Sequence, residues 1–351
     1  MVLPQFHRLQ IAEVVAETDD ARSLVFDLPE SLRDVFAYRP GQFLTLRVPV
    51  NGAAQQRCYS LSSTPEVDDA LRVTIKRVRS GQVSNWICDH LGAGDTIEVM
   101  PPAGVFTPRA LHGDFLLLAG GSGITPVLSI AKAALRHGRG NITLVYANRD
   151  ENAIIFRDAL RELAAQHPGR LRVIHWLDSV LGPPSSRQLE ELVRPWSLAD
   201  CFICGPAPFM DCAQAALQAL GVPPGNIHLE RFGAAPAQPP AEAPRASTAA
   251  PEAEALAPCG PVPMTVELDG TAHRVTAQAG ETVLDALLRA DIAAPNSCRT
   301  GLCGACMCRV EGGSVRLGEN HVLDAADLEA GWTLACQAVP VGDEVHLKFP
   351  D

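Results

Sequence analysis

The closest constraint on this chain is a cysteine cluster, because four of its eleven cysteines lie in the segment CRTGLCGACMC. Cys298, Cys303 and Cys306 follow a C-x4-C-x2-C spacing, and Cys336 lies further on, in LACQ. Four thiolates in this arrangement can hold a 2Fe-2S cluster, because a tight loop wraps the first three around one side of it. A zinc site is the open alternative, although such sites more commonly show two C-x2-C pairs. Cys308 falls outside the spacing and is interpreted as a small strand residue.

The residues before the cysteines predict a small α+β domain. MTVELDG and TAHRVTAQ both alternate between apolar and polar residues, and Asp269 with Gly270 suits a hairpin turn between them. ETVLDALLRA then predicts a helix. Its apolar side chains share one helical face: Val283, Leu284, Leu287 and Leu288.

An alanine- and proline-rich segment, residues 233–262, separates this domain from the rest of the chain. It has no aromatic residue and no apolar stripe, and its composition predicts a semi-rigid linker. The segment that follows, residues 263–351, contains 13 acidic and 6 basic residues, so it holds −7 of the formal charge of −11. This acidity argues against a nucleic-acid partner, which would require an excess of Lys and Arg.

The middle of the chain, residues 111–232, predicts a doubly wound α/β domain. FLLLAGGSGITPVLSIAKAALRHG contains a buried strand over 115–119, a glycine turn, and a helix that begins near Pro126. Such a turn lets a pyrophosphate approach the backbone and the helix N-terminus. The segments ITLVYANRD, RLRVIHWLD and DCFICGPAPFM predict three further strands. We expect a ligand at the carboxyl ends of these strands.

Residues 1–110 predict a small antiparallel β-barrel. The segments FLTLRVPV, QRCYSLSS, LRVTIKRV and DTIEVMPP are short alternating or apolar strands separated by Gly, Pro and Asp. VSNWICDHL is the one helix expected among them. At 351 residues the chain thus divides into three domains and a linker.

The chain shows neither a secretory signal nor an apolar stretch of about 20 residues that could span a bilayer. We therefore expect a cytoplasmic monomer that binds neither membrane nor nucleic acid. Thiols stay reduced in that compartment, which favours metal binding over disulfides.

Five motifs stand in the order expected of the ferredoxin-NADP reductase superfamily: RCYS, GQVSNW, GGSGITP, CGPAPFM and ERF. The C-terminal domain resembles plant-type ferredoxins, which implies a β-grasp fold and a 2Fe-2S cluster. The order of the domains resembles that of reductase components of bacterial oxygenases. Among these it is most similar to the reductases of ketosteroid 9α-hydroxylase and of phenylacetyl-CoA epoxidase.

The resemblance implies how a flavin is held. Arg57 would pair with a flavin phosphate, Tyr59 would lie against the isoalloxazine, and Ser60 would hydrogen-bond near its atom N5. Three residues match the segment that cradles the pyrophosphate through backbone N–H groups: Gly81, Val83 and Ser84. Trp86 either touches the adenine or only packs, and Phe232 would cover the flavin. GQVSNWICDHL is similar to the FAD-binding members, so FAD is expected in preference to FMN.

The resemblance also implies how a nicotinamide nucleotide is held. Four residues of the glycine turn would bind it: Gly121, Gly123, Thr125 and Pro126. Cys204 would lie beside the nicotinamide, and Glu230 would place a carboxylate near it, so that Ser60, Cys204 and Glu230 form the catalytic set. Asp178 would accept ribose hydroxyls and repel a 2′-phosphate, which favours NADH, while Arg149 argues for NADPH.

The function implied is that of a reductase passing electrons from NADH through FAD and the cluster to a terminal oxygenase. NAD(P)H releases two electrons as a hydride and the cluster accepts one, so a flavin must stand between them. We expect a Rieske-type oxygenase as acceptor, and a di-iron monooxygenase such as phenylacetyl-CoA epoxidase is the alternative. A stand-alone electron carrier is a further alternative, which GGSGITP and CGPAPFM oppose. No haem-bearing segment precedes the barrel in this sequence, which disfavours a nitric-oxide-type dioxygenase.

Overall fold

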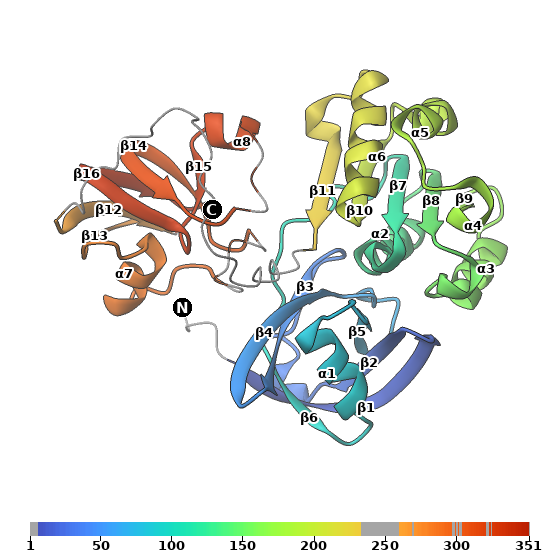
Figure 1. Ribbon diagram of the computed structural model, residues 1–351, viewed down its shortest axis with the longest axis horizontal. Coiled ribbons are helices and arrows are strands. Elements are labelled where there is room, and N and C mark those ends of the chain that lie inside the picture. Colours follow the sequence, from blue (N-terminus) through green and yellow to red (C-terminus); the bar gives the residue numbers. More distant parts are fainter. Residues whose placement is uncertain are drawn as a thin grey trace, which may run out of the picture. The chain divides into compact units, whose positions relative to one another are not determined.

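A computed structural model describes residues 6–232, 260–268, 270–296, 299, 301, 304–320, 323 and 325–350 (Figure 1). The chain forms two compact units, Pro4–Phe232 and a second that comprises Gly233–Asp351 with Met1–Leu3. Residues 233–259 of the expected linker and Asp269 of the expected hairpin turn lie outside the described residues.

The first part of the larger unit is a six-stranded antiparallel sheet in the order β4-β3-β6-β1-β2-β5. Its elements are β1 (His7–Thr18), β2 (Ala21–Asp27), β3 (Phe43–Val50), β4 (Ala53–Ser60), β5 (Leu71–Lys76), α1 (Gln82–His90), β6 (Thr96–Val99) and the 3-10 turn η1 (Glu30–Leu32). A bridge between Leu61 and Val73 joins the two edge strands, so the sheet closes into a barrel. This confirms the predicted antiparallel barrel.

Two strands of the barrel, β1 and β2, were not expected from the sequence. The pairing of β1 with β2 has register shifts between Ile11 and Glu13 and between Ala16 and Thr18. Each shift interrupts the alternation of buried and exposed side chains by which a strand is recognised in a sequence. The predicted helix is present as α1, which packs Val83, Ile87 and Cys88 into the barrel core.

The second part of the larger unit is a five-stranded parallel sheet in the order β11-β10-β7-β8-β9. Its strands are β7 (Phe115–Gly120), β8 (Ile142–Asn148), β9 (Leu171–Leu177), β10 (Asp200–Gly205) and β11 (Ile227–Arg231). Its helices are α2 (Ile124–His137), α3 (Arg157–Gln166), α4 (Asp178–Leu181), α5 (Ser186–Val193) and α6 (Ala207–Ala219). Its 3-10 turns are η2 (Gly121–Gly123), η3 (Glu151–Ala153), η4 (Arg194–Trp196) and η5 (Pro224–Asn226).

Helices cover both faces of this parallel sheet, as the apolar runs in its strands predicted. Helices α2 and α3 share a core with one set of alternate strand residues, and α5 and α6 share a core with the other set. The chain runs outward from β7 to β8 and β9, then returns to place β10 on the other side of β7. In sheets of this kind ligands bind outside the carboxyl ends of the strands at this reversal, here β7 and β10.

The barrel packs against the α2 side of the parallel sheet (Figure 1). Ala21 and Phe106 from the barrel part belong to the same apolar core as α2 and α3. The ring of Phe106 meets that of Phe202 edge to face, with centroids 5.2 Å apart. The two parts therefore bury a common apolar surface.

The smaller unit is a mixed five-stranded sheet in the order β13-β12-β16-β14-β15, with β12 parallel to β16 and the other pairs antiparallel. Its elements are β12 (Val262–Leu268), β13 (Thr271–Ala277), α7 (Val283–Arg289), β14 (Met307–Leu317), α8 (Ala325–Glu329), β15 (Trp332–Leu334) and β16 (Ala338–Lys348). Val283, Leu284 and Leu287 of α7 are buried against the sheet, as their spacing predicted. β12 begins at Val262, the last residue of the expected linker segment. None of the helices in the described ranges of the two units is long and apolar enough to cross a membrane.

Candidate functional site

Strand β4 ends at the first group of predicted site residues. Ser60 pairs with Phe43 of β3 and is 2% exposed, and its Oγ has no hydrogen-bond partner among the described residues. A buried hydroxyl without a partner costs about 1–3 kcal/mol, so this position suits a ligand that accepts or donates a hydrogen bond. Arg57 and Tyr59 precede Ser60 on the same strand. Tyr59 packs against the barrel core, and burial raises its pKa.

The N-terminus of α1 faces the same strand and can bind an anion. Gly81 precedes the helix and has no room for a side chain, because a β-carbon there would lie 2.7 Å from the Ser84 Oγ. The Ser84 hydroxyl accepts a hydrogen bond from the Val78 N–H (3.2 Å), and Val83 is buried in the barrel core. Both side chains are thus committed to the fold, and what the first turn offers a phosphate is its backbone N–H groups.

Two further contacts define the surroundings of α1. The side chain of Gln55 in β4 donates to that of Gln82 at a distance of 3.0 Å, which ties the strand to the helix start. Trp86 stacks on His90 with ring centroids 4.8 Å apart and packs against the barrel core. Of the two roles considered for Trp86, the described contacts show packing.

The glycine turn after β7 lies directly against the backbone that follows β10. A β-carbon at Gly123 would collide with the Cys204 carbonyl group, and one at Gly120 would lie 2.9 Å from Cδ of Pro206. Gly121 has a positive φ of 50°. Only glycines allow this approach, which brings GGSGITP and CGPAPFM together at the carboxyl ends of β7 and β10.

The remaining predicted residues of this turn shape it from within. The Thr125 hydroxyl donates to the Ser122 carbonyl oxygen (3.0 Å) and is 2% exposed as a residue. Pro126 is buried in the first turn of α2, which begins at Ile124. Their described contacts are therefore with the protein itself, and they set the conformation of the turn.

Tyr146 is a residue of the site that the sequence analysis missed. It is fully buried in β8, and its hydroxyl donates to the Gly121 carbonyl oxygen (3.0 Å) while it accepts from the Ile155 N–H (3.2 Å). It therefore anchors the glycine turn to the segment that precedes α3. The available signal was a tyrosine inside an otherwise apolar strand, because a buried phenol requires a hydrogen-bond partner.

Lys76 is a second missed residue, contributed by the barrel. Its ammonium group would lie 3.7 Å from a β-carbon at Gly121, so β5 brings a cation beside the glycine turn. Desolvation lowers the pKa of Lys76, and Asp20, whose carboxylate is 3.8 Å away, opposes that effect. No local sequence pattern relates Lys76 to Gly121.

Cys204 and Glu230 are neighbours on adjacent parallel strands, at the carboxyl end of β10. Burial raises the pKa of the Cys204 thiol well above its ordinary value, and the charge of Glu230 adds to the shift. Desolvation raises the pKa of Glu230 to about 8. At neutral pH the pair is thus a neutral thiol beside a mostly protonated carboxyl group, which suits hydrogen bonding and proton holding rather than nucleophilic attack.

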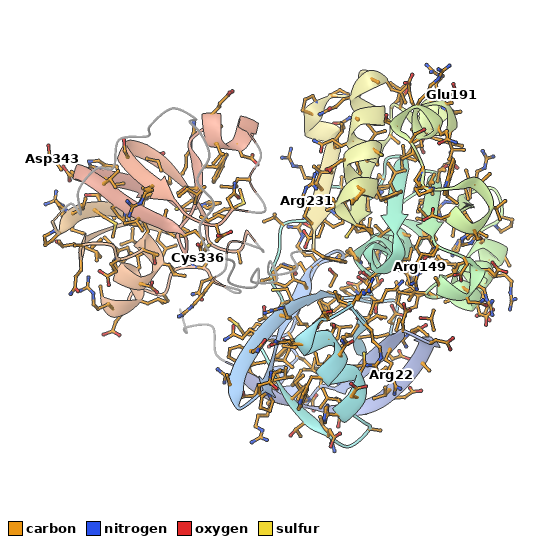
Figure 2. All side chains as sticks on the ribbon, in the orientation of Figure 1. Arg22, Arg149, Glu191, Arg231, Cys336 and Asp343 are labelled. Carbon is orange, nitrogen blue, oxygen red and sulfur yellow. The ribbon has the colours of Figure 1, made fainter. Side chains whose placement is uncertain are left out.

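The ends of β8 and β9 place Asp178 and Arg149 differently from one another. Asp178 begins α4, and its Oδ1 is buried without a hydrogen-bond partner in the part of the chain described. The Arg149 guanidinium instead pairs with Asp20 of the barrel at 2.9 Å, where the two parts of the unit meet (Figure 2). The acceptor at this edge of the sheet is therefore Asp178, while Arg149 has a carboxylate partner elsewhere.

The cysteine site is described in part. Cys306 and Cys336 are both buried, and the Ala335 N–H donates to the Cys306 carbonyl oxygen (3.0 Å), which brings their two segments together. Figure 2 labels Cys336. Cys298 and Cys303 lie outside the described residues. Buried thiols on adjoining segments are donors that suit an iron–sulfur cluster.

Gln337, which follows Cys336, holds the cysteine loop and was not anticipated. Its amide donates to the Arg299 carbonyl oxygen (3.0 Å) and accepts from the Glu319 N–H (3.2 Å). Gly301 has a φ of 73°, and a β-carbon there would collide with the Glu319 carbonyl group. Cys308 is fully buried, and burial raises its pKa to about 12, in agreement with a packing role.

Comparison with protein families gives three matches along the chain. An oxidoreductase FAD-binding domain matches residues 8–107, and an oxidoreductase NAD-binding domain matches residues 117–215. A 2Fe-2S iron-sulfur cluster binding domain matches residues 266–341. The three matches follow the barrel, the parallel sheet and the mixed sheet in order.

Individual relatives match nearly the whole chain. The ferredoxin reductase component of 3-ketosteroid-9-alpha-monooxygenase from Rhodococcus rhodochrous is 47% identical, over 97% of this chain and 96% of its own. One of the proteins that make up 1,2-phenylacetyl-CoA epoxidase in Escherichia coli is 36% identical, over 98% of both chains. Among solved structures, phthalate dioxygenase reductase is similar with a TM-score of 0.59 and 25% identity, over 98% of both chains.

We predict that Tyr146→Phe raises the KM for the nicotinamide nucleotide about 5- to 10-fold with a smaller effect on kcat. The substitution leaves the Gly121 carbonyl and the Ile155 N–H unpaired and so loosens the turn, a loss of about 1–3 kcal/mol. Steady-state reduction of ferricyanide measures both constants. Tyr38→Phe is the control, because that hydroxyl bonds Ser63 within the barrel. Equal constants for Tyr146→Phe and the unmodified chain would contradict the role of Tyr146.

A second prediction concerns pH. The pKa of Glu230 is about 8 in the folded chain and 4.5 ordinarily, so between these values the folded state keeps a proton that the unfolded state has lost. Stability from this group therefore falls as pH rises through that window, by up to about 1.4 kcal/mol per unit. Glu230→Gln should remove this component. Thermal unfolding midpoints of both proteins from about pH 5 to about pH 8 measure it, and parallel curves would refute it.

Proposed function

Because the chain belongs to the family of oxygenase ferredoxin reductase components, with FAD-binding, NAD-binding and 2Fe-2S domains in one chain, we propose a 3-ketosteroid 9α-monooxygenase as its acceptor. It is an NAD(P)H-dependent oxidoreductase whose cofactors are FAD and a 2Fe-2S cluster, and its partner is a terminal oxygenase. We further propose that this oxygenase is of the Rieske type.

The observation that carries this choice of acceptor is the similarity over the full length of the chain. Relatives named as reductase components of the ketosteroid enzyme are 47% to 50% identical over 97% to 98% of the chain. The epoxidase protein matches the same length at 36%. The excess in identity favours the ketosteroid oxygenase over the epoxidase.

The described residues around Ser60 fit a flavin. Its unpartnered Oγ is available to hydrogen-bond near the reactive edge of the ring, and Arg57 and the open N–H groups of Gly81, Val83 and Ser84 are available to the phosphates. When bound, FAD accepts two electrons as a hydride and releases them singly to the cluster. Tyr59 would lie against the ring.

The turn formed by Gly121 and Gly123 would bind the nicotinamide nucleotide through its backbone, supported by Thr125 and Pro126. Cys204 and Glu230 would lie beside the nicotinamide, where their protonated forms hold the reacting ring and exclude water. Asp178 would accept the ribose hydroxyls with its unpartnered Oδ1, which favours NADH over NADPH.

The remaining proposals concern the organisation of the chain. Phe232, 40% exposed, would cover the flavin, and Cys298, Cys303, Cys306 and Cys336 would ligate the cluster. The domains would span residues 1–110, 111–232 and 263–351, with a linker over 233–262. We propose a monomer in the cytoplasm, because cluster ligands must stay reduced thiols.

The nucleotide proposal predicts that Asp178→Ser lowers the preference for NADH over NADPH about tenfold, equivalent to about 1.4 kcal/mol. Removing the carboxylate takes away an acceptor for the ribose and the repulsion of a 2′-phosphate. Steady-state kcat/KM values for both nucleotides measure the preference. Asp158→Ser, which removes an exposed acidic residue of α3, is the control. An unchanged ratio would exclude Asp178 from nucleotide selection.

Reconstitution with purified oxygenase components tests the acceptor. The chain with NADH should support hydroxylation by a 3-ketosteroid 9α-oxygenase and not epoxidation by a phenylacetyl-CoA epoxidase complex lacking its own reductase. Cys336→Ser should abolish the iron–sulfur absorption and the coupling to the oxygenase while NADH still reduces ferricyanide, because the FAD- and NAD-binding domains form a separate unit. Turnover with the epoxidase alone would overturn the proposal.

A further inference from the structure

The two proposed half-sites lie in different parts of the larger unit, so their relative position is set by how these parts dock. Ser60 belongs to the barrel, and the glycine turn belongs to the parallel sheet. A small polar surface, here called the interdomain contact, joins the segment after Ser60 to α2, the helix that follows the turn. It consists of Ser63, Thr64 and Asp68 from the barrel part and Ser129 and Lys132 from α2.

The centre of the interdomain contact is a reciprocal pair of hydrogen bonds. The Ser129 hydroxyl donates to the Ser63 carbonyl oxygen (2.7 Å), and the Thr64 hydroxyl donates to the Ser129 carbonyl oxygen (3.1 Å). All three residues are at most 1% exposed. Because buried hydrogen bonds cannot be exchanged for water, the pair defines one position of α2 against the barrel segment.

An ion pair extends the contact along α2. The Lys132 ammonium lies 2.9 Å and 3.0 Å from the two carboxylate oxygens of Asp68, and the side chains are 15% and 23% exposed. Asp68 also accepts from the Thr64 N–H at 2.8 Å. One carboxylate thus holds both the barrel loop and the helix.

The interdomain contact is close in sequence to both half-sites. Ser63 is three residues after Ser60, so the extended chain between them spans at most about 10 Å. Ser129 is six residues after Gly123 on a continuous helix, which corresponds to about 9 Å of axial rise. A displacement at the contact is therefore transmitted to the turn and to the flavin strand with little intervening chain to absorb it.

The apolar part of the interface does not set orientation in the same way. Burial of Phe106 against Phe202 favours association but is non-directional, whereas hydrogen bonds fix distance and angle. Hydride transfer is sensitive to both, since the reacting atoms must approach to about 3–3.5 Å and a misplacement of about 1 Å can cost about 100-fold in rate.

We propose that Ser129 and Lys132 are positioning residues, which hold the nucleotide turn in register with the flavin strand through Ser63, Thr64 and Asp68. The proposal rests on the proposed flavin and nucleotide sites. In the step affected, the C4–H bond of the dihydronicotinamide breaks, and hydrogen with its electron pair bonds to flavin N5, so that the nucleotide is oxidised and the flavin reduced.

The test uses the full-length FAD-loaded protein and two variants, Ser129→Ala with Thr64→Val, and Lys132→Met. Anaerobic stopped-flow measurement at saturating NADH should show flavin reduction slowed about 10- to 100-fold, with the Kd for NAD⁺ changed less than about threefold. Lys132→Arg should restore most of the rate, because it keeps the cation.

Hydrogen–deuterium exchange supplies a readout independent of turnover. Adding FAD to the apoprotein should slow exchange in residues 124–137 of the unmodified chain, because the flavin strand and α2 are coupled, and not in the two variants. Ser62→Ala is the matched control, since that buried hydroxyl bonds Thr74 within the barrel. Arg47→Met plays the same part for the ion pair, as Arg47 pairs with Glu98 of the same barrel.

The outcomes separate the two levels of the argument. Failure of NADH to reduce the flavin of the unmodified chain would refute the proposed sites themselves. Normal reduction together with unchanged rates and exchange in the variants would refute only the positioning role. Equal losses in Ser62→Ala and in Ser129→Ala with Thr64→Val would show general destabilisation and would likewise overturn the inference.

Discussion

The site depends on the direct packing of two backbone turns at the carboxyl ends of β7 and β10. Gly123 has no side chain because the Cys204 carbonyl group occupies that space, and Gly120 and Gly205 are similarly close to their neighbours. This contact brings Cys204 and the glycine turn to one place, and parallel pairing then brings Glu230 beside Cys204. Tyr146 completes the arrangement, since its buried hydroxyl pairs with the Gly121 carbonyl oxygen and so holds the turn in place.

Buried polar groups divide into those that complete the fold and those that remain open. The hydroxyl of Thr125 and that of Ser84 have partners inside their own turns, and the hydroxyl of Ser129 bonds across to the barrel. The Ser60 Oγ and the Asp178 Oδ1 have none within the described ranges, and each lies at the end of a strand where the family binds a cofactor or a nucleotide. Because an unsatisfied buried acceptor or hydroxyl is costly, these two atoms are the strongest structural indication of where ligands bind.

The two compact units answer different chemical requirements. The larger unit brings flavin and nucleotide into fixed contact, which requires rigid packing between the barrel and the parallel sheet. The smaller unit requires buried thiols on a loop whose backbone bends sharply, and Gly301 with a positive φ and Gln337 with its two backbone contacts meet that need. The separation of the units explains why loss of the cluster need not disturb the chemistry of the flavin.

The sequence by itself determined the fold class, the three cofactor-related motifs and their order, because each depends on a short local pattern such as C-x4-C-x2-C or a strand followed by glycines. It did not reveal β1 and β2, whose bulges break the alternation, nor the contacts of Tyr146 and Lys132. The partners of these two side chains are 25 and 64 residues away along the chain. Only the tertiary structure decided which buried polar atoms find partners and which are left for ligands, because pairing at such separations is set by the docking of whole strands and helices rather than by neighbouring residues.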